Sequence, residues 1–283
     1  MRAKPWAGFA ALLVVLATAS CGSGGSGREA APPAGDAGAP GAGEPAGQPA
    51  ATPLPAPGSG GVIAGRVLLA GAPPAAATIN MGADPYCKTR HAAAPASESL
   101  VANADGSLRY VFVYLKAGLP PGARYAAPSE PVRLDQVGCQ YRPHVFGILV
   151  GQPLLIRNSD GTLHNVHSLA RNTKAFNIGM PDQGLEVTRT FDAEEIMVRI
   201  KCDVHPWMES WAGVLPHPFF AVSGDGGSFA LRDVPPGTYT IEAWHEELGV
   251  QTQSVTVEPG TPVTLDFTFQ AAAATNADTR GER

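Results

Sequence analysis

The residues most able to do chemistry in this chain lie in the run Cys202-Asp203-Val204-His205-Pro206-Trp207-Met208. A thiolate, an imidazole and a thioether stand there at C-x2-H-x2-M spacing, and a second imidazole, His164, lies 38 residues before the cysteine. Two histidines and a cysteine in a trigonal plane, with a weak axial methionine, are the ligands of a type 1 copper site. Zinc usually takes four strong nitrogen or sulfur ligands and no methionine. The spacing therefore predicts one copper ion on His164, Cys202, His205 and Met208.

Two alternatives to this ligand set remain open. Met180 also lies between His164 and Cys202 and could supply the axial thioether, although the loop spacing favours Met208. A buried free cysteine that stands near a histidine and a methionine by chance is the alternative without metal. The His164-Asn165 pair upstream argues against chance.

The ligands need elements that bring them together. Residues 196–202 are β-branched and apolar enough for a strand, and residues 211–215 predict the next strand, so the ligands between them converge from one tight connection. His164 has to come from a neighbouring strand. Asn165 is expected to hydrogen-bond the ligand loop and hold it closed. Pro206 is expected to stiffen that loop, because proline fixes φ and removes a backbone donor.

The ligand run and the residues upstream of it resemble the cupredoxins, and most closely the amicyanin branch. That family has the same short loop with His-Pro, and its upstream ligand lies in a run like Leu163-His164-Asn165-Val166-His167. The likeness covers roughly residues 130–216. It implies a Greek-key β-sandwich, one type 1 copper on the four residues above, and one-electron transfer rather than enzymatic catalysis. It also implies that the ring of His205 is exposed and is the point where the electron leaves.

Trp207 and Trp211 flank the axial methionine and have two interpretations. Either they pack the ligand loop, or they form an exposed apolar patch around His205 against which a redox partner docks through a small, transient interface. The chain shows no second copper centre of the multicopper oxidase kind, so oxidase chemistry is not expected.

The rest of the chain has the pattern of strands. Residues 62–69, 108–115 and 185–191 are β-branched, aromatic or cleanly alternating, and Gly- and Asp-rich turn signals separate such segments. No long segment has a helical period. The fold class is therefore all-β, built of sandwiches.

A second signature follows the copper loop. Residues 227–241 predict a strand, a Pro-Gly turn and a strand, and they resemble the carboxypeptidase regulatory-like domain, a small prealbumin-like β-sandwich. The first strand of that family is similar to residues 61–67, which precede the copper core. Either the copper domain is inserted into the second sandwich, or the opening segment packs on the copper domain. We slightly favour the interleaved arrangement.

The N-terminus has the pattern of a bacterial lipoprotein signal. Arg2 and Lys4 precede an apolar stretch that is short for a stable membrane span, and Thr18-Ala19-Ser20-Cys21 resembles a lipobox with Cys21 as the lipidated residue. Ordinary signal cleavage nearby is the alternative. Residues 22–60 are Gly, Ala, Pro and Ser with almost no large apolar side chain, which predicts a disordered linker.

The four cysteines divide between three roles. Cys21 is assigned to lipid and Cys202 to copper, which leaves Cys87 and Cys139 as a pair in an oxidising compartment. A disulfide between them would contribute about 4 kcal/mol in the chain-entropy account. The alternative is a second metal site on Cys139 and His144.

The sequence thus predicts a lipid-anchored electron carrier of the periplasm or cell envelope, which exchanges single electrons with redox proteins and touches the membrane only through its anchor. The mild charge, 20 basic against 25 acidic residues, gives no sign of nucleic-acid binding. A copper-storage or copper-delivery protein, and an adhesion or scaffold module that binds glycan or protein, are the alternatives. The expected organisation is a signal peptide (1–21), a disordered linker (22–60), an N-terminal β segment of either sandwich (61–129), the cupredoxin core (130–216), the regulatory-like sandwich (217–270) and a disordered tail (271–283).

Overall fold

Strands make up nearly all of the regular structure in the computed structural model, which describes residues 51–271. One short helix, α1 (Pro85–Lys88), interrupts them. β1 (Gly61–Ala70) shows why the sequence forms strands, since buried and more exposed positions alternate along most of its length. The prediction of an all-β chain is confirmed.

Two sheets that share one apolar core form what we call the terminal sandwich. In the first sheet β1 pairs antiparallel with β13 and parallel with β16 and β17. The second sheet has the order β12-β2-β14-β15. Apolar side chains from both sheets, among them Ile63, Leu231 and Ile241, are fully buried in its core. Besides β1, its strands are β2 (Phe112–Ala117), β12 (Phe220–Val222), β13 (Ser228–Val234), β14 (Gly237–His245), β15 (Gly249–Val257), β16 (Val263–Thr264) and β17 (Phe267–Gln270).

Two further sheets form what we call the inner sandwich. Their strand orders are β5-β11-β10-β7-β8 and β4-β3-β6-β9. Its core contains Leu134, Ile148 and Val198 together with Cys202 and Met208, so the predicted ligands sit at the end of a packed interior. Its strands are β3 (Val132–Gln136), β4 (Tyr141–Arg142), β5 (Val145–Leu149), β6 (Leu154–Asn158), β7 (His164–Ser168), β8 (Asn177–Met180), β9 (Glu186–Arg189), β10 (Glu195–Lys201) and β11 (Glu209–Leu215).

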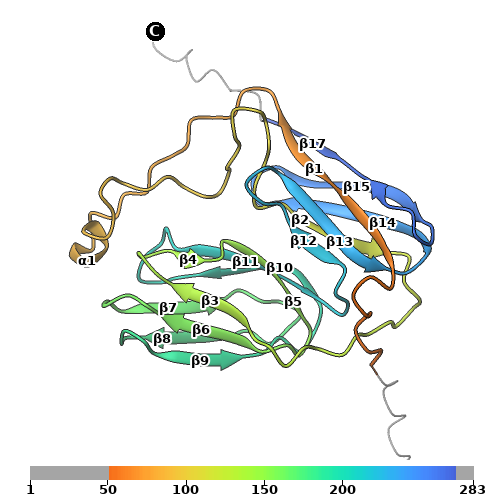
Figure 1. Cartoon of the computed structure of the whole chain (residues 1–283). Coiled ribbons are helices and arrows are strands. Elements are labelled where there is room, and N and C mark those ends of the chain that lie inside the picture. The colour runs from red at the N-terminus through yellow and green to blue at the C-terminus, as the bar shows by residue number, and fades with distance from the viewer. Residues whose placement is uncertain (1–50, 272–283) are drawn as a thin grey trace, which may run out of the picture. The chain divides into compact units, whose positions relative to one another are not determined.

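The inner sandwich is inserted into the terminal sandwich. Strands β3 to β11 lie in the chain between β2 and β12, which pair with each other. Figure 1 shows the first strand, β1 in orange, beside the last, β17 in blue. Of the two arrangements that the sequence left open, this pairing is the interleaved one. Side chains of both sandwiches share a third buried cluster, which contains Phe112, Val145 and Leu215.

The last ten residues of the predicted disordered linker, 51–60, lie within the described part of the chain. Thr52 forms an isolated bridge with Tyr125, because its N–H donates to Arg124 O and its carbonyl accepts from Ala126 N, both at 2.7 Å. The N–H of Gly58 donates to a carboxylate oxygen of Asp233 at 2.6 Å. Small residues without apolar side chains are thus held here by backbone hydrogen bonds, which composition does not reveal.

The predicted signal peptide with Cys21, linker residues 22–50 and tail residues 272–283 lie outside the described residues. Within residues 51–271, no helix is long and apolar enough to cross a membrane.

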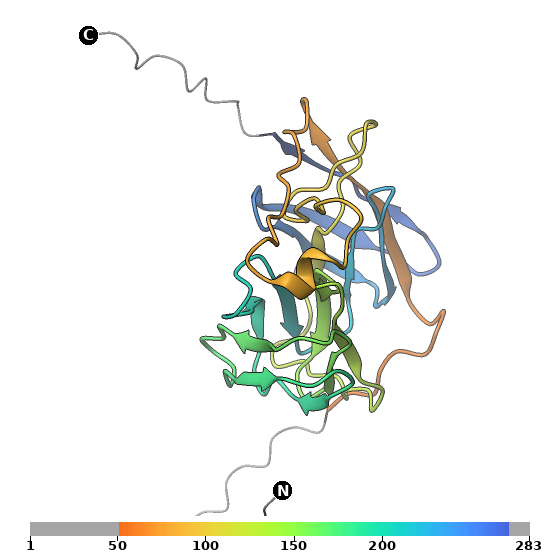
Figure 2. The ribbon, with the colours of Figure 1, turned by 90° about the vertical axis from the view of Figure 1, so that its left-hand side faces the viewer.

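The segment between β1 and β2 leaves the terminal sandwich and reaches the inner one. It carries α1, which Figures 1 and 2 show beside the green strands of the inner sandwich. Met81 and Cys87 of this segment are buried in the core of the inner sandwich. A disulfide joins Cys87 to Cys139, with an S–S distance of 2.08 Å and a Cα–Cα distance of 5.6 Å. The segment is therefore attached covalently to the sandwich that carries the predicted ligands.

Candidate metal centre

The ligand loop is the connection between β10 and β11. Those strands pair up to Lys201 and Glu209, so the residues between them must turn back within the loop. The N–H of Cys202 donates to Met208 O at 3.1 Å, and the N–H of Met208 donates to His205 O at 2.9 Å. These bonds close the loop and hold its three predicted ligands at one end of the sandwich.

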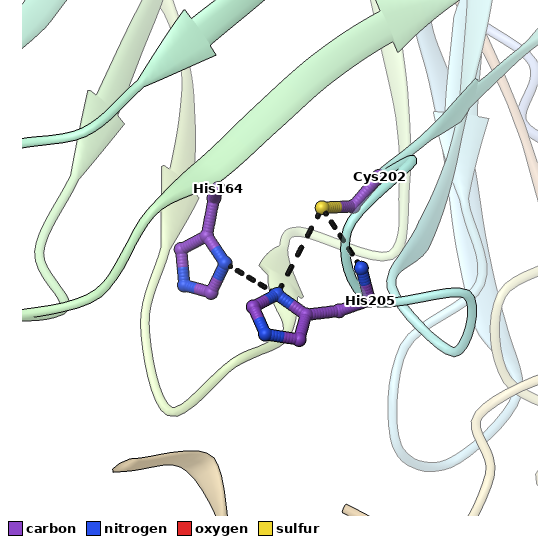
Figure 3. A group of neighbouring side chains, drawn as sticks. All are labelled: His164, Cys202 and His205. Carbon is purple, nitrogen blue, oxygen red and sulfur yellow. Dashed lines mark hydrogen bonds between the residues drawn. The ribbon is translucent and has the colours of Figure 1, made fainter. Parts of the chain in front are cut away.

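His164 begins β7, which pairs with β10 on one side and β8 on the other. Its Nδ1 lies 2.9 Å from Nδ1 of His205, and the Cys202 sulfur lies 3.9 Å from the same nitrogen (Figure 3). The ligand atoms of His164, Cys202 and His205 all lie within 4.8 Å of one another, and all three residues are buried. Two imidazoles and one thiol that converge from two elements fit a single copper ion.

Met208 and Met180 are the two methionines considered for the axial position. Both are buried in the core of the inner sandwich, with Cys202. Met208 is bonded through its backbone to Cys202 and His205, whereas Met180 stands opposite His164 in the β7–β8 pair. The loop therefore places Met208 close in the chain to two of the three converging ligands, Cys202 and His205, and its axial role stays a prediction.

A buried carboxylate holds Nε2 of His164, the outer ring nitrogen that faces away from the other predicted ligands. Nε2 of this histidine donates to Asp160 at 3.0 Å, and the same carboxyl group accepts from the backbone N–H of Gly138 and Cys139 at 2.9 and 2.7 Å. Burial raises the pKa of Asp160, but these hydrogen bonds outweigh it and the pKa is lowered. Burial lowers the pKa of His164, but its bonds to Asp160 and Cys202 outweigh burial and raise it. The ring is thereby fixed with Nδ1 towards the other ligands.

A second carboxylate holds the outer nitrogen of His205. Nε2 of that histidine lies 3.0 Å from Oδ2 of Asp84, which comes from the segment between β1 and β2. The pKa of Asp84 is lowered, first by its hydrogen bond from the Cys87 N–H and also by His205. Neither Asp84 nor Asp160 was predicted to take part in the site. Asp160 stands four residues before His164, and this spacing could have indicated the pair in the sequence. Asp84 is far from His205 in the chain, so no local pattern indicates that pair.

Asn165 links β7 to the ligand loop. Its Oδ1 accepts from the backbone N–H of Asp203 at 2.6 Å and lies 3.4 Å from the Cys202 sulfur, and its Nδ2 donates to the Asp203 carboxylate at 3.1 Å. These are contacts of the kind expected for this residue. Burial raises the pKa of Cys202, but hydrogen bonds from His164 and from backbone N–H groups outweigh it, so the pKa is lowered. A thiol with a lowered pKa is prepared to act as a thiolate ligand.

The expectation that the ring of His205 is exposed is wrong. The residue is only 2% exposed. Its Nε2 faces Asp84 and lies 3.6 Å from the Cys87 sulfur, and the ring of Trp207 packs beside it with a centroid distance of 5.0 Å. The cause is the segment between β1 and β2, which covers this edge. Pro206 remains exposed in the ligand loop.

The two tryptophans beside the ligand loop pack against the protein. Trp207 donates from Nε1 to the carbonyl of Cys139 at 3.0 Å. Trp211 donates to Glu246 at 2.9 Å and packs on Trp244, with ring centroids 5.1 Å apart. Of the two interpretations, the packing role is the one that these contacts match.

The alternative metal site on Cys139 and His144 is not formed. Cys139 is in the disulfide, and Nε2 of His144 is hydrogen-bonded to Glu246. His144 thereby joins β4 and β5 of the inner sandwich to the turn after β14 of the terminal sandwich.

Comparison with known proteins returns both kinds of domain that the sequence resembles. Residues 217–270 match the family described as carboxypeptidase regulatory-like domain. Similar solved structures include a purple cupredoxin from Nitrosopumilus maritimus, with 25% identity, TM-score 0.25, and 29% of this chain and 97% of that chain covered. A reduced Cu(I) form of an amicyanin variant has 17% identity, TM-score 0.27, and 36% and 97% coverage.

A Cu-containing nitrite reductase from Thermus scotoductus is also similar, with 22% identity and TM-score 0.29; the match covers 35% of this chain and only a quarter, 25%, of the reductase. Comparison with curated proteins finds no match. The ligand geometry, rather than these distant likenesses, supports copper in this chain.

Proposed function

We propose that this chain is a copper protein that carries single electrons, with one type 1 copper on His164, Cys202, His205 and Met208. The observation that carries the proposal is the convergence of two imidazole nitrogens and a thiol sulfur within 4.8 Å, all buried. Copper bound there would supply a one-electron couple between Cu(II) and Cu(I). The donor set is mixed, since the Cys202 sulfur suits the reduced ion and the imidazoles suit the oxidised one.

The protein supports this role by holding the ligands still. Asp160 and Asp84 fix the outer nitrogens of the two imidazoles, and Asn165 ties the ligand loop to β7. A site whose ligands move little between oxidation states has a small reorganisation cost, which favours rapid electron transfer. The same rigidity favours retention of the ion over its delivery to another protein. We therefore place electron transfer ahead of copper handling, and a carrier ahead of an enzyme.

The partners we propose are redox proteins of the cell envelope. We further propose that Cys21 carries a lipid that anchors the chain, in the periplasm or cell envelope. The lipobox-like run before Cys21 supports the anchor. The disulfide between Cys87 and Cys139 supports an oxidising compartment.

The test is spectroscopic. The full chain is loaded with one equivalent of Cu(II), and its visible absorption and EPR spectrum are recorded beside those of Cys202→Ser. An intense blue band with narrow copper hyperfine splitting, lost in Cys202→Ser, is the expected result. A pale spectrum with wide splitting, equal in the two proteins, would refute thiolate coordination. Rapid loss of copper to a chelator would move the copper-handling role ahead.

A further inference from the structure

We propose that Asp84 is a positioning residue for the copper centre, supplied by a strap that a disulfide fastens over His205. The strap is residues 79–91, part of the connection between β1 and β2. It holds the ring of His205 from outside the inner sandwich and closes the centre on that side. This inference deepens the proposed function and rests on it.

Asp84 is held so that each carboxyl oxygen has one main task. Oδ1 accepts from the N–H of Cys87 at 3.0 Å and caps the first turn of α1. Oδ2 accepts from Nε2 of His205 at 3.0 Å, with the hydroxyl of Thr162 at 3.4 Å. Because the cap fixes one oxygen, the other cannot swing away from the imidazole without breaking the turn.

The strap is fastened to the inner sandwich at several points besides Asp84. The Cys87–Cys139 disulfide is buried, and Nε2 of His91 lies 2.7 Å from the carbonyl of Gly138. The hydroxyl of Tyr86 lies 3.4 Å from Asp160, the carboxylate that holds His164. One connected group of contacts therefore positions the outer nitrogens of His164 and His205. The strap contributes to each, through Tyr86 beside Asp160 and through Asp84 beside His205.

The strap has two consequences for the centre. A ligating histidine whose outer N–H is held by a carboxylate keeps its tautomer and orientation, and loss of such a partner typically weakens metal binding about 10–100-fold. The ring of His205 is also enclosed by Asp84, Cys87 and Trp207, so a partner protein has no direct contact with it. Electrons must cross the strap or the ligand loop instead.

Asp84→Asn separates the two tasks of this side chain. Asparagine is as good a cap as aspartate, so its Oδ1 keeps the bond from Cys87. Its Nδ2 then faces Nε2–H of His205, and two donors oppose each other. The matched control is Asp225→Asn, which makes the same charge change on a side chain that is 86% exposed in the terminal sandwich. A second variant, Cys87→Ser with Cys139→Ser, keeps the Asp84 side chain but removes the disulfide that fastens the strap holding it against His205.

The first readout needs no copper. In 1H–15N NMR spectra of the metal-free full chain, we expect a downfield Nε2 proton of His205 that exchanges slowly with water. In Asp84→Asn and in the double serine variant, this proton is expected to exchange faster, because the carboxylate that accepts it is replaced or no longer held against the ring. Asp225→Asn should be unchanged. An equally slow proton in Asp84→Asn would overturn the proposal.

The second readout is Cu(I) affinity, measured by competition with a chromogenic chelator. Asp84→Asn is expected to bind Cu(I) about 10–100-fold more weakly than the unaltered chain, and Asp225→Asn equally tightly. Unchanged affinity in Asp84→Asn would refute the positioning role. If the unaltered chain gives no blue band while Asp84→Asn alters proton exchange, the proposed function fails and the strap over His205 stands. If Asp84→Asn does not fold, the double serine variant decides the question by the same two readouts.

Discussion

Acid should destabilise the terminal sandwich, because this sandwich buries two histidines that must stay neutral. Nδ1 of His217 accepts from the N–H of Phe219 at 3.3 Å, and Nδ1 of His245 accepts from the N–H of Glu247 at 3.2 Å. Only a neutral ring offers this acceptor. Burial lowers the pKa of each histidine from 6.5 to about 4.

The direction of the pH dependence follows from these values. Above pH 6.5 both rings are neutral in the folded and the unfolded chain and add no pH dependence. Between pH 6.5 and about 4 the unfolded chain binds protons that the folded chain does not, so stability falls as the pH falls. At pH 5 each histidine is expected to remove about 2 kcal/mol of unfolding free energy, and about 3.4 kcal/mol once the pH is below 4.

His217→Asn tests this magnitude. The amide oxygen of asparagine can stand where Nδ1 stands and accept from Phe219, but it does not titrate. Unfolding of the metal-free chain in urea is followed at pH 7.5 and at pH 5, and the loss between the two pH values is compared between proteins. The unaltered chain should lose about 2 kcal/mol more than His217→Asn, and about 4 kcal/mol more than the variant with His245→Asn as well. Equal losses in all three proteins would refute the reasoning.

Three further predictions concern packing and covalent structure, each measured by urea unfolding of the metal-free chain. Gly213→Ala places a Cβ 2.3 Å from the ring of Phe112 between the two sandwiches and should cost about 1–3 kcal/mol, so an unchanged midpoint would contradict the tight packing. Asn165→Ala removes the acceptor of the Asp203 N–H and should cost about 1–3 kcal/mol, and a neutral result would show that water replaces it. Cys139→Ser opens the disulfide and should cost about 4 kcal/mol, a value that a loss below 1 kcal/mol would exclude.

Three of the four proposed ligands could be proposed from the sequence because they are local in it. Cys202, His205 and Met208 lie within seven residues, and a hairpin connection leaves few ways to arrange them. His164 was found through its neighbour Asn165, whose amide reaches the loop. The exposure of His205 was mispredicted, because Asp84 lies 121 residues away and approaches through an irregular segment. No periodicity marks such a segment, and of the contacts that place it only the disulfide was predicted from the sequence.

The strand pattern alone predicted sandwiches, and only the family likeness of residues 61–67 favoured the interleaved connection between them. Residues 61–67 have the alternation that any half-buried strand has, and alternation does not identify a partner strand. The pairing of β1 with β13 and β17 is a contact between the two ends of the chain. The hydrogen bonds of residues 51–60 could not be predicted from the sequence for a related reason. Thr52 and Gly58 are held by backbone groups, which every residue type possesses.

The insertion of one sandwich into the other explains how the strap reaches the proposed metal centre. The connection that carries Asp84 and Cys87 starts at β1 and ends at β2, so both of its ends are fixed in the terminal sandwich. Its middle is fixed to the inner sandwich by the disulfide and by the ion pair between Glu98 and Arg142. Residues 130–216 alone would keep all four predicted ligands and would lose Asp84. The proposed copper centre therefore takes one residue from the connection between two strands of the terminal sandwich, and an isolated inner sandwich would leave Nε2 of His205 without its carboxylate.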